Sequence, residues 1–388
     1  MPLLGTDGAT RTYHLQAPPA EQPSGAPPSA RVAYAAAHVV PKPWADNTPG
    51  RPADIDWDAT LAFRRHVWSC GLGVADAMDT AQRNMGLDWP ATVELIRRSA
   101  AEARHIGGRL VVGVNTDHLP DATASLRQIA DAYLEQLELA EAAGADVVLM
   151  ASRHLARTAT TGKDYASVYQ RVLSQASRPV ILHWLGEAFD ANLAGYFGAA
   201  AWPDAASTVR DIIGENLHVV AGIKMSLLDV EAERTLRRAL PEPARLFTGD
   251  DFHYVDLIEG ATDDDGVHRH SDALLGAFAA FPDRASVALR HLDVGDIAAY
   301  RATLGPTEAL ARQVFAAPTQ FYKTGIAFLS WLNGHQASFT MVGGLHAGRS
   351  LPHLSSIVEL ADRAAALADP ELAARRWRAL LRVNGFDA

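Results

Sequence analysis

The chain has 388 residues, of which 48% are hydrophobic and 21% are charged, as in an ordinary globular protein. Its 35 basic and 45 acidic residues give a formal charge of -10, the wrong sign for many contacts to nucleic-acid phosphates. The composition therefore excludes a disordered or fibrous chain, and it predicts a small-molecule partner and no nucleic-acid partner.

The single cysteine, Cys70, excludes an internal disulfide framework, predicts no thiolate zinc site and is typical of a reducing compartment. No apolar run reaches the roughly 18 residues that a membrane helix needs; the stretch around residues 193–202 is too short. Residues 1–30 contain several prolines and lack the basic start and apolar block of a secretory signal, so we interpret them as a flexible arm. We expect a cytoplasmic protein with no membrane partner.

From residue 31 onward, short apolar runs alternate with amphipathic stretches, which is the pattern of βαβ units and a parallel sheet. Strands are expected at residues 32–40, 73–78, 110–114, 146–150, 179–183, 219–223, 244–248 and 285–289. Helices are expected between them at residues 57–70, 90–106, 122–142, 163–176, 205–213 and 229–239.

Eight such strands predict an α/β protein with one (β/α)8 barrel over residues 31–294, followed by a C-terminal helical extension over residues 295–388. The alternative is an open doubly wound sheet. That fold favours a glycine-rich phosphate turn after the first strand, and residues 38–44 contain none. We therefore favour the barrel.

In a (β/α)8 barrel the reactive groups gather at the carboxyl ends of the strands. The polar residues that follow the second to the seventh predicted strand are Asp79, Thr80, Gln82 and Arg83; Asn115, Asp117 and His118; Ser152, Arg153 and His154; His183, Trp184 and Glu187; Lys224; and Asp250, Asp251 and His253.

Lys224 directly follows a buried apolar run. Loss of water at such a place drives the pKa of an amine down from about 10.4, toward the neutral nucleophile that a Schiff base requires. A structural ion pair of Lys224 with Asp250 or Asp251 explains the same position. The position alone leaves both interpretations open.

Two motifs decide between them. Residues 222–224 (GIK) and 248–251 (TGDD) resemble the strand-six Gly-Ile-Lys and strand-seven Ser-Gly-Asp-Asp of the dihydrodipicolinate synthase and N-acetylneuraminate lyase family. These Schiff-base aldolases are (β/α)8 barrels with a C-terminal helical extension, and the resemblance covers residues 31–345. It implies an imine at Lys224 with no separate cofactor, a keto acid or keto sugar as substrate, and a homodimer or homotetramer. The reaction would be aldol cleavage, aldol addition or dehydration.

The sequence departs from the family at two places. Residues 79–83 (DTAQR) fall where the family has Gly-Thr-Thr-Gly-Glu, so Thr80 is kept and Ala81 replaces a threonine. Residues 181–184 (ILHW) fall where it has Ile-Leu-Tyr-Asn, so His183 replaces the tyrosine that relays protons. Arg153 lies near the place of a second relay tyrosine. The chain therefore resembles a divergent branch.

We expect Lys224 to be the nucleophile and His183 the acid and base, because an imidazole exchanges protons near pH 7. Thr80 is expected to orient His183 or to bind substrate. Substrate contacts are expected from Asp79, Ala81, Arg153, Trp184, Gly249, Asp250 and Asp251. Because Asp79 would repel a carboxylate, a neutral keto compound should bind better than pyruvate unless Arg83 or Arg153 neutralises the pair.

Two other classes of function stay open. One is a divalent-metal sugar isomerase or hydrolase, with ligands drawn from Asp79, Asp117, His118, His183, Glu187 and His253. No His-Glu-x-x-His spacing is present, and we expect no catalytic metal. The other is a sugar-binding barrel that has lost its activity.

Overall fold

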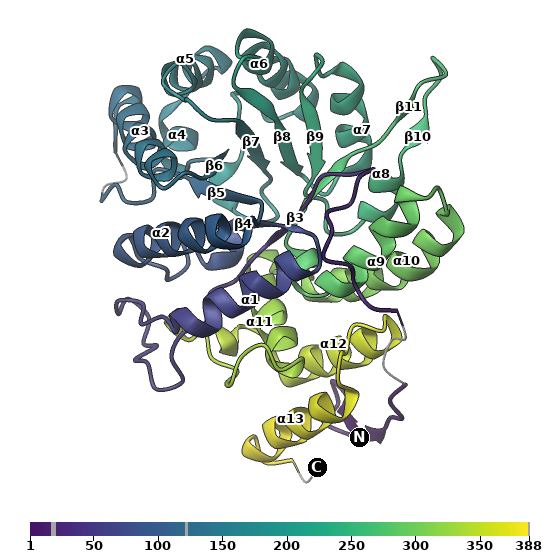
Figure 1. Cartoon of the computed structure of the whole chain (residues 1–388). Coiled ribbons are helices and arrows are strands. Elements are labelled where there is room, and N and C mark those ends of the chain that lie inside the picture. The colour runs from purple at the N-terminus through teal and green to yellow at the C-terminus, as the bar shows by residue number, and fades with distance from the viewer. Residues whose placement is uncertain (17–20, 121–122, 387–388) are drawn as a thin grey trace.

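Eight parallel strands close into a barrel in the computed structural model of the chain, which describes residues 1–16, 21–120 and 123–386. Around the barrel the strands are β12 (Asp272–Leu275), β3 (Ala33–Ala36), β4 (Gly73–Asp76), β5 (Leu110–Val114), β6 (Asp146–Leu149), β7 (Val180–Leu185), β8 (Val220–Ser226) and β9 (Arg245–Thr248). The barrel closes because β12 pairs with both β9 and β3. The predicted (β/α)8 barrel is confirmed (Figure 1).

Helices connect the strands and cover the outside of the barrel. They are α1 (Trp57–Ser69), α2 (Trp89–Ile106), α3 (Leu126–Ala142), α4 (Arg153–Thr158), α5 (Gly162–Leu173), α6 (Trp202–Glu215), α7 (Val230–Ala239), α8 (Tyr254–Glu259) and α9 (Pro282–Asp293). The C-terminal extension adds α10 (Ile297–Val314), α11 (Tyr322–Leu332), α12 (Leu351–Arg363) and α13 (Pro370–Val383). Two small hairpins pair β1 (Pro2–Leu4) with β2 (Thr10–Thr12) and β10 (Ala261–Thr262) with β11 (His268–Arg269).

The helices begin at local capping signals. The Asp88 side chain accepts a hydrogen bond from the Ala91 amide at the start of α2, and Ser125 and Gln128 form a reciprocal capping box at the start of α3. The predicted start of that helix, Ala122, lies outside the described residues. Of the other predicted helices, 57–70 and 229–239 match α1 and α7 within one residue at each end.

The predicted eighth strand, residues 285–289, is wrong. These residues lie inside α9, and β12 closes the barrel instead. A short apolar run is equally compatible with a buried helix and a buried strand. Polar contacts fix β12: the Asp272 carboxylate accepts from the Val32 amide at 2.7 Å and from Arg245 Nη1 at 2.7 Å, so it joins the two flanking strands.

Apolar side chains fill the interior of the barrel. They are Tyr34, Ala36, Ala75, Met78, Val111, Val148, Met150, Ile181, Phe247 and Leu274. A much larger core packs between the outer faces of the strands and the helices. Because the interior is packed and is not a channel, polar chemistry is confined to the strand ends.

The two chain termini pack together away from the barrel (Figure 1). The Leu4 amide donates to Ser355 Oγ of α12 at 2.8 Å, and Trp377 Nε1 of α13 donates to the Pro2 carbonyl at 2.8 Å. Residues 17–20 of the predicted arm lie outside the described residues. The division into an arm, a barrel and an extension stays a prediction. No helix in the described part of the chain combines the length and apolar character needed to span a bilayer.

Candidate active site

Lys224 and His183 are direct neighbours, because His183 of β7 pairs in register with Lys224 of β8. Side chains alternate along a strand, and Ile181 lies in the barrel interior, so His183 points the same way. On β8, Ile223 and Met225 pack in the outer core, which directs Lys224 inward. His183 is 0% exposed and Lys224 is 8% exposed. The fold thus places a lysine and a histidine together inside the carboxyl end of the barrel.

Gly249 makes room for the Lys224 side chain. A Cβ at position 249 would collide with Ser226 Oγ and would lie 2.8 Å from Lys224 Cε and 2.9 Å from the Met225 carbonyl oxygen. Gly249, directly after β9, therefore leaves the space that the side chains of Lys224 and Ser226 occupy.

The surroundings of Lys224 shift its ionisation. Burial lowers the pKa of the Lys224 amine, and the carboxylates of Asp79 and Asp251 oppose that shift. Lys224 therefore lies near two acidic groups from two other strand ends, and its amine loses its proton more easily than an exposed lysine does.

His183 is a neutral imidazole in this environment. Burial first, and then the charge of Lys224, lowers the pKa of His183 well below its ordinary value of 6.5. Its Nε2 lies 3.3 Å from Ser226 Oγ, whereas its buried Nδ1 makes no hydrogen bond. Buried polar nitrogens normally have partners, so the unbonded Nδ1 is available to exchange a proton.

Thr80 does not contact His183; its partner is a residue that sequence reasoning missed. Thr80 Oγ1 lies 2.9 Å from the hydroxyl of Tyr322, at the start of α11. Burial, followed by the charge of Asp79, raises the pKa of Tyr322 well above its ordinary value, and Asp251 acts in the same direction. The same two carboxylates act on Lys224, so the Tyr322 hydroxyl and the Lys224 amine face one acidic region.

The ring of Tyr322 is fixed by packing. It stacks on Phe315 with ring centroids 4.3 Å apart and an interplanar angle of 11°. A Cβ at Gly276, directly after β12, would lie 3.2 Å from Tyr322 Cε2. The extension therefore packs against a strand end and delivers a phenol to the barrel mouth. No pattern in the sequence marks Tyr322, because it follows no strand.

Sequence reasoning also missed a second buried lysine, Lys323, which is 3% exposed. Its Nζ donates to the Gln320 carbonyl at 3.1 Å. Burial lowers the pKa of Lys323 to about 8, opposed by the carboxylates of Asp79 and Asp190 and assisted by Arg153. Arg153 itself pairs with Asp190, with Nε to Oδ2 at 2.5 Å. Acidic and basic groups, Asp79, Asp190, Lys323 and Arg153, therefore lie close enough to influence one another.

The two aspartates after β9 have different roles. Asp250 accepts from the amides of Phe252 and His253 at 2.8 and 3.1 Å and lies 3.0 Å from His253 Nδ1, so it holds its own loop. Asp251 accepts from the Ala277 amide at 2.8 Å. Burial raises the pKa of Asp251 to about 7, although the Ala277 amide and Lys224 oppose the shift. Only Asp251 faces the lysine.

Two predicted substrate contacts lie outside this group. Trp184 alternates with His183 on β7 and packs outward, with its ring 5.3 Å from that of Phe197. Ala81 is 0% exposed and belongs to the outer core. The structure therefore does not bring Trp184 or Ala81 into the barrel mouth.

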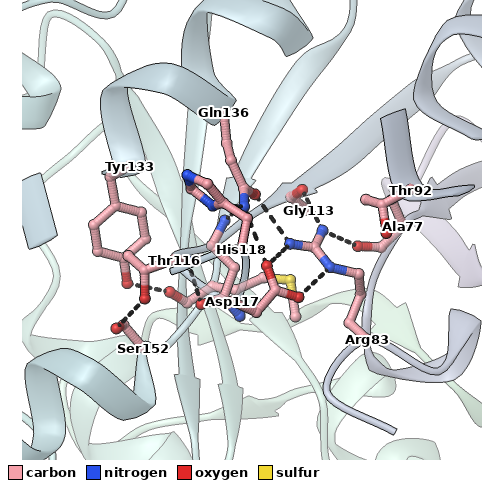
Figure 2. A network of polar contacts seen from close by, with 12 residues as sticks. Ala77, Arg83, Thr92, Gly113, Thr116, Asp117, His118, Tyr133, Gln136 and Ser152 are labelled. Carbon is pink, nitrogen blue, oxygen red and sulfur yellow. Dashed lines mark hydrogen bonds and ion pairs between the residues drawn. The ribbon is translucent and has the colours of Figure 1, made fainter. Parts of the chain in front are cut away.

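Arg83 is held in a separate buried network (Figure 2). Its guanidinium binds both oxygens of Asp117, with Nε to Oδ2 at 2.6 Å, and donates to Gln136 Oε1 at 3.0 Å. Its Nη1 donates to the carbonyls of Ala77 and Gly113 at 3.0 and 3.1 Å. With these contacts Arg83 braces the loops after β4 and β5, and it is not free to neutralise Asp79.

The six residues weighed as ligands of a divalent metal do not come together. Asp117 and Gln136 are bonded to each other and to Arg83, and His118 Nδ1 lies 2.7 Å from Gln136 Nε2. His253 belongs to the Asp250 loop. Among the described residues, no three of the six place their ligand atoms close enough to hold one ion.

The closed barrel with its C-terminal helices superimposes on solved structures of dihydrodipicolinate synthases. The chain superimposes on the dihydrodipicolinate synthase from Thermotoga maritima with a TM-score of 0.62 and 14% identity, covering 87% of this chain and 100% of that one. The dihydrodipicolinate synthase from Bacteroides thetaiotaomicron has a TM-score of 0.61 and 14% identity, with 90% of this chain and 98% of that one covered. The 4-hydroxy-tetrahydrodipicolinate synthase from Methylacidiphilum fumariolicum has a TM-score of 0.61 and 15% identity, with 91% of this chain and 98% of that one covered. At this identity the likeness shows the fold alone.

The chain belongs to the family described as "Protein of unknown function (DUF993)", which it matches over residues 1–386. Comparison with curated protein sequences gives no match.

Proposed function

We propose that the protein is a Schiff-base lyase, a divergent branch of the dihydrodipicolinate synthase and N-acetylneuraminate lyase type. It acts on a keto acid or keto sugar by aldol cleavage, aldol addition or dehydration. The observation that carries this proposal is Lys224, a buried amine with a lowered pKa that points into the carboxyl end of a barrel. Amines of this kind are nucleophiles toward carbonyl carbon.

The reaction begins when the neutral amine of Lys224 attacks the substrate carbonyl carbon. A C–N bond forms, and the carbonyl electron pair moves to oxygen, which takes up a proton. The resulting carbinolamine loses this oxygen as water and leaves an iminium ion. The iminium accepts the electron pair of a breaking C–C or C–H bond at the neighbouring carbon and becomes an enamine. In C–C cleavage the other fragment leaves as a carbonyl compound as its hydroxyl gives a proton to a base, and in C–H cleavage the proton itself passes to the base. Protonation of the enamine on carbon restores the iminium, and addition of water releases the product and the Lys224 amine, so the cycle needs no oxidant or metal.

Two groups are placed to move the protons. The neutral imidazole of His183, the register partner of Lys224, has an unbonded Nδ1. The Tyr322 hydroxyl, bonded to Thr80, is a second proton donor and acceptor in the same region. In the family that the sequence resembles, a strand-five tyrosine relays protons, and His183 stands in its place here. We propose that the hydroxyl of Tyr322, which the C-terminal extension supplies, relays these protons instead.

The charges at the mouth bear on the substrate. Asp79 lies near the Lys224 amine and disfavours a carboxylate there. The charges of Asp79 and Asp190 also act on Lys323, as does the charge of Arg153. A neutral keto group at Lys224, in a polyhydroxylated substrate, fits this pattern better than pyruvate does. We continue to expect the protein to be a homodimer or homotetramer in the cytoplasm.

The test is covalent trapping. The purified full-length protein is incubated with pyruvate and with a panel of neutral ketoses and then reduced with borohydride, and the adduct is mapped by mass spectrometry. We expect the adduct on Lys224, and we expect Lys224→Ala to lose both adduct and turnover, whereas exposed Lys163→Ala keeps both. An adduct on Lys323, or turnover by Lys224→Ala, would overturn the proposal.

The same assay separates the alternatives. An imine serves as its own electron sink, so trapping and turnover should survive exhaustive chelation. Turnover that EDTA abolishes and manganese or magnesium restores would favour a metal-dependent isomerase or hydrolase. Binding of a ketose without an adduct or turnover would favour a sugar-binding barrel.

A further inference from the structure

A second cluster of reactive side chains lies at the other end of the barrel. His66 is in the last turn of α1, and Cys70 is the residue that caps this helix. Residues four apart lie on the same face of a helix, so both side chains point the same way, toward Asp283 in the first turn of α9. Cys70 precedes β4, at the amino ends of the strands, whereas Lys224 lies toward the carboxyl end of β8.

The distances between the three candidate ligand atoms are close to those between the ligands of a metal site. Cys70 Sγ lies 3.0 Å from Asp283 Oδ1, and His66 Nε2 lies 3.5 Å from the same oxygen. All three atoms are within 4.8 Å of one another. Bond lengths of about 2.0–2.3 Å to a tetrahedral zinc ion place its ligands about 3.3–3.8 Å apart. Small side-chain shifts therefore suffice to close the three groups on one ion.

The bonding of the three groups also suits a metal. His66 Nε2 is a buried atom that makes no hydrogen bond. In the metal-free protein, burial and then Asp283 raise the pKa of the Cys70 thiol, which keeps its proton and donates it to Asp283. A bound cation would reverse this shift.

A cavity gives access to the cluster and supplies a fourth position. It has a volume of about 260 Å³ and is lined in part by Asp283 and His335. The ring of His335 lies 4.3 Å from that of His66, centroid to centroid. Either His335 or a water in this cavity can complete four-coordination.

We propose that His66, Cys70 and Asp283 form a zinc site that joins α1 to α9. As zinc binds, a bond forms between the metal and Cys70 sulfur, and the thiol proton passes to solvent. The single cysteine predicts no thiolate zinc site because such sites usually contain several thiolates; this mixed set of nitrogen, sulfur and oxygen needs only one. The site is independent of the imine chemistry at Lys224.

Cobalt titration of the apo protein tests the site directly. Cys70 is the only cysteine in the chain, so the near-ultraviolet sulfur-to-cobalt charge-transfer absorption reports on this residue alone. We expect the band to saturate at one equivalent of cobalt and to disappear when one equivalent of zinc chloride is added. Zinc should also raise the Tm of the wild-type protein, because it binds the folded state.

Matched variants separate this site from other histidines. Cys70→Ser keeps a hydroxyl donor for Asp283 but should lose the band and the zinc-dependent rise in Tm. His66→Ala and Asp283→Asn should weaken zinc binding by at least about 10-fold, whereas the exposed His105→Ala should bind as the wild type does. Absence of the band in the wild-type protein with excess cobalt would overturn the proposal. Wild-type zinc affinity in folded His66→Ala would do so as well.

Discussion

The hydroxyl of Thr80 lies 2.9 Å from the hydroxyl of Tyr322, a residue 242 positions away in the chain. Thr80 belongs to the turn after β4, and Tyr322 begins α11 of the C-terminal extension. The contact places the start of the extension at the barrel mouth, where the charges of Asp79 and Asp251 raise the pKa of Tyr322 and oppose the lowering of the pKa of Lys224. In this molecule the extension therefore contributes a side chain to the candidate active site.

Tyr322→Phe tests the proton-transfer role of this hydroxyl. Removing one oxygen leaves the stacked ring in place, so the fold should be kept. We expect turnover to fall by about 100-fold or more, which is the usual scale for acid and base groups. Borohydride trapping at Lys224 should persist. Tyr300→Phe removes a buried hydroxyl that donates to the Val255 carbonyl and should leave turnover unchanged. Full turnover by Tyr322→Phe would make the Thr80 contact merely structural.

His183→Ala tests the second acid and base candidate. His183 is paired with Lys224 and has an unbonded Nδ1, so we expect turnover to fall by about 100-fold or more while the adduct stays trappable. Single-turnover kinetics and mass spectrometry of the trapped adduct measure the two effects separately. If His183→Ala turns over at the wild-type rate, the histidine is only a neighbour of Lys224.

Gly249→Ala should displace the Lys224 side chain and so prevent imine formation, although the lysine itself is unchanged. The added methyl group would collide with Ser226 Oγ and approach Lys224 Cε at 2.8 Å, so the lysine must leave its place. We expect loss of trapping and a lower Tm, since overpacking typically costs about 1–3 kcal/mol. The control is Gly214→Ala in α6, where a Cβ meets nothing within 4 Å. This change should raise helix stability by roughly 0.5–1 kcal/mol and preserve trapping.

Asp79 is expected to select against carboxylate substrates. Pyruvate and a neutral ketose compete for Lys224, and the ratio of the two borohydride adducts is measured by mass spectrometry. In the wild-type protein the ketose adduct should dominate. Asp79→Asn removes the charge that acts on Lys224 and should shift the ratio toward pyruvate by at least about 10-fold. Strong pyruvate trapping that is the same in both proteins would show that Asp79 does not select against carboxylate substrates.

Glu233 makes stability depend on pH. Burial raises the pKa of this α7 carboxyl from 4.5 to about 8, although hydroxyl donors from Ser271 and Thr248 oppose the shift. Between these two pH values the folded state binds more protons than the unfolded state, so the free energy of unfolding falls as pH rises. The limit for one group is about 1.4 kcal/mol per pH unit.

Urea unfolding at about pH 6.5 and about pH 8 measures this effect as a difference between variants, because the histidines contribute equally to the wild type and to Glu233→Gln. Glu233→Gln should remove the loss of stability that this carboxyl contributes across the interval. Glu231→Gln on the same helix, whose side chain is 73% exposed, should leave the loss as it is in the wild type. Equal pH dependence in Glu233→Gln and the wild type would contradict the prediction.

The eighth strand shows where local sequence stops being informative. Residues 285–289 form an apolar run that fits a strand, yet they continue the helix that begins at Pro282. The true strand, β12, has only four residues. It is defined by Asp272, which binds Val32 on one side and Arg245 on the other. Such bonds to distant residues leave no trace in a short window of sequence.

The sequence by itself determined the alternation of seven strands with helices and the association of Lys224 with the sixth strand, because apolar periodicity is a local property. It predicted Lys224 just after that strand, whereas the structure places it inside β8. Only the tertiary structure decided which of the polar residues meet. It brought Tyr322 and Lys323 to the barrel mouth, turned Trp184 away from it, and fixed Arg83 in another network. These outcomes depend on strand register and on the docking of the extension, which are set by contacts between segments far apart in the chain.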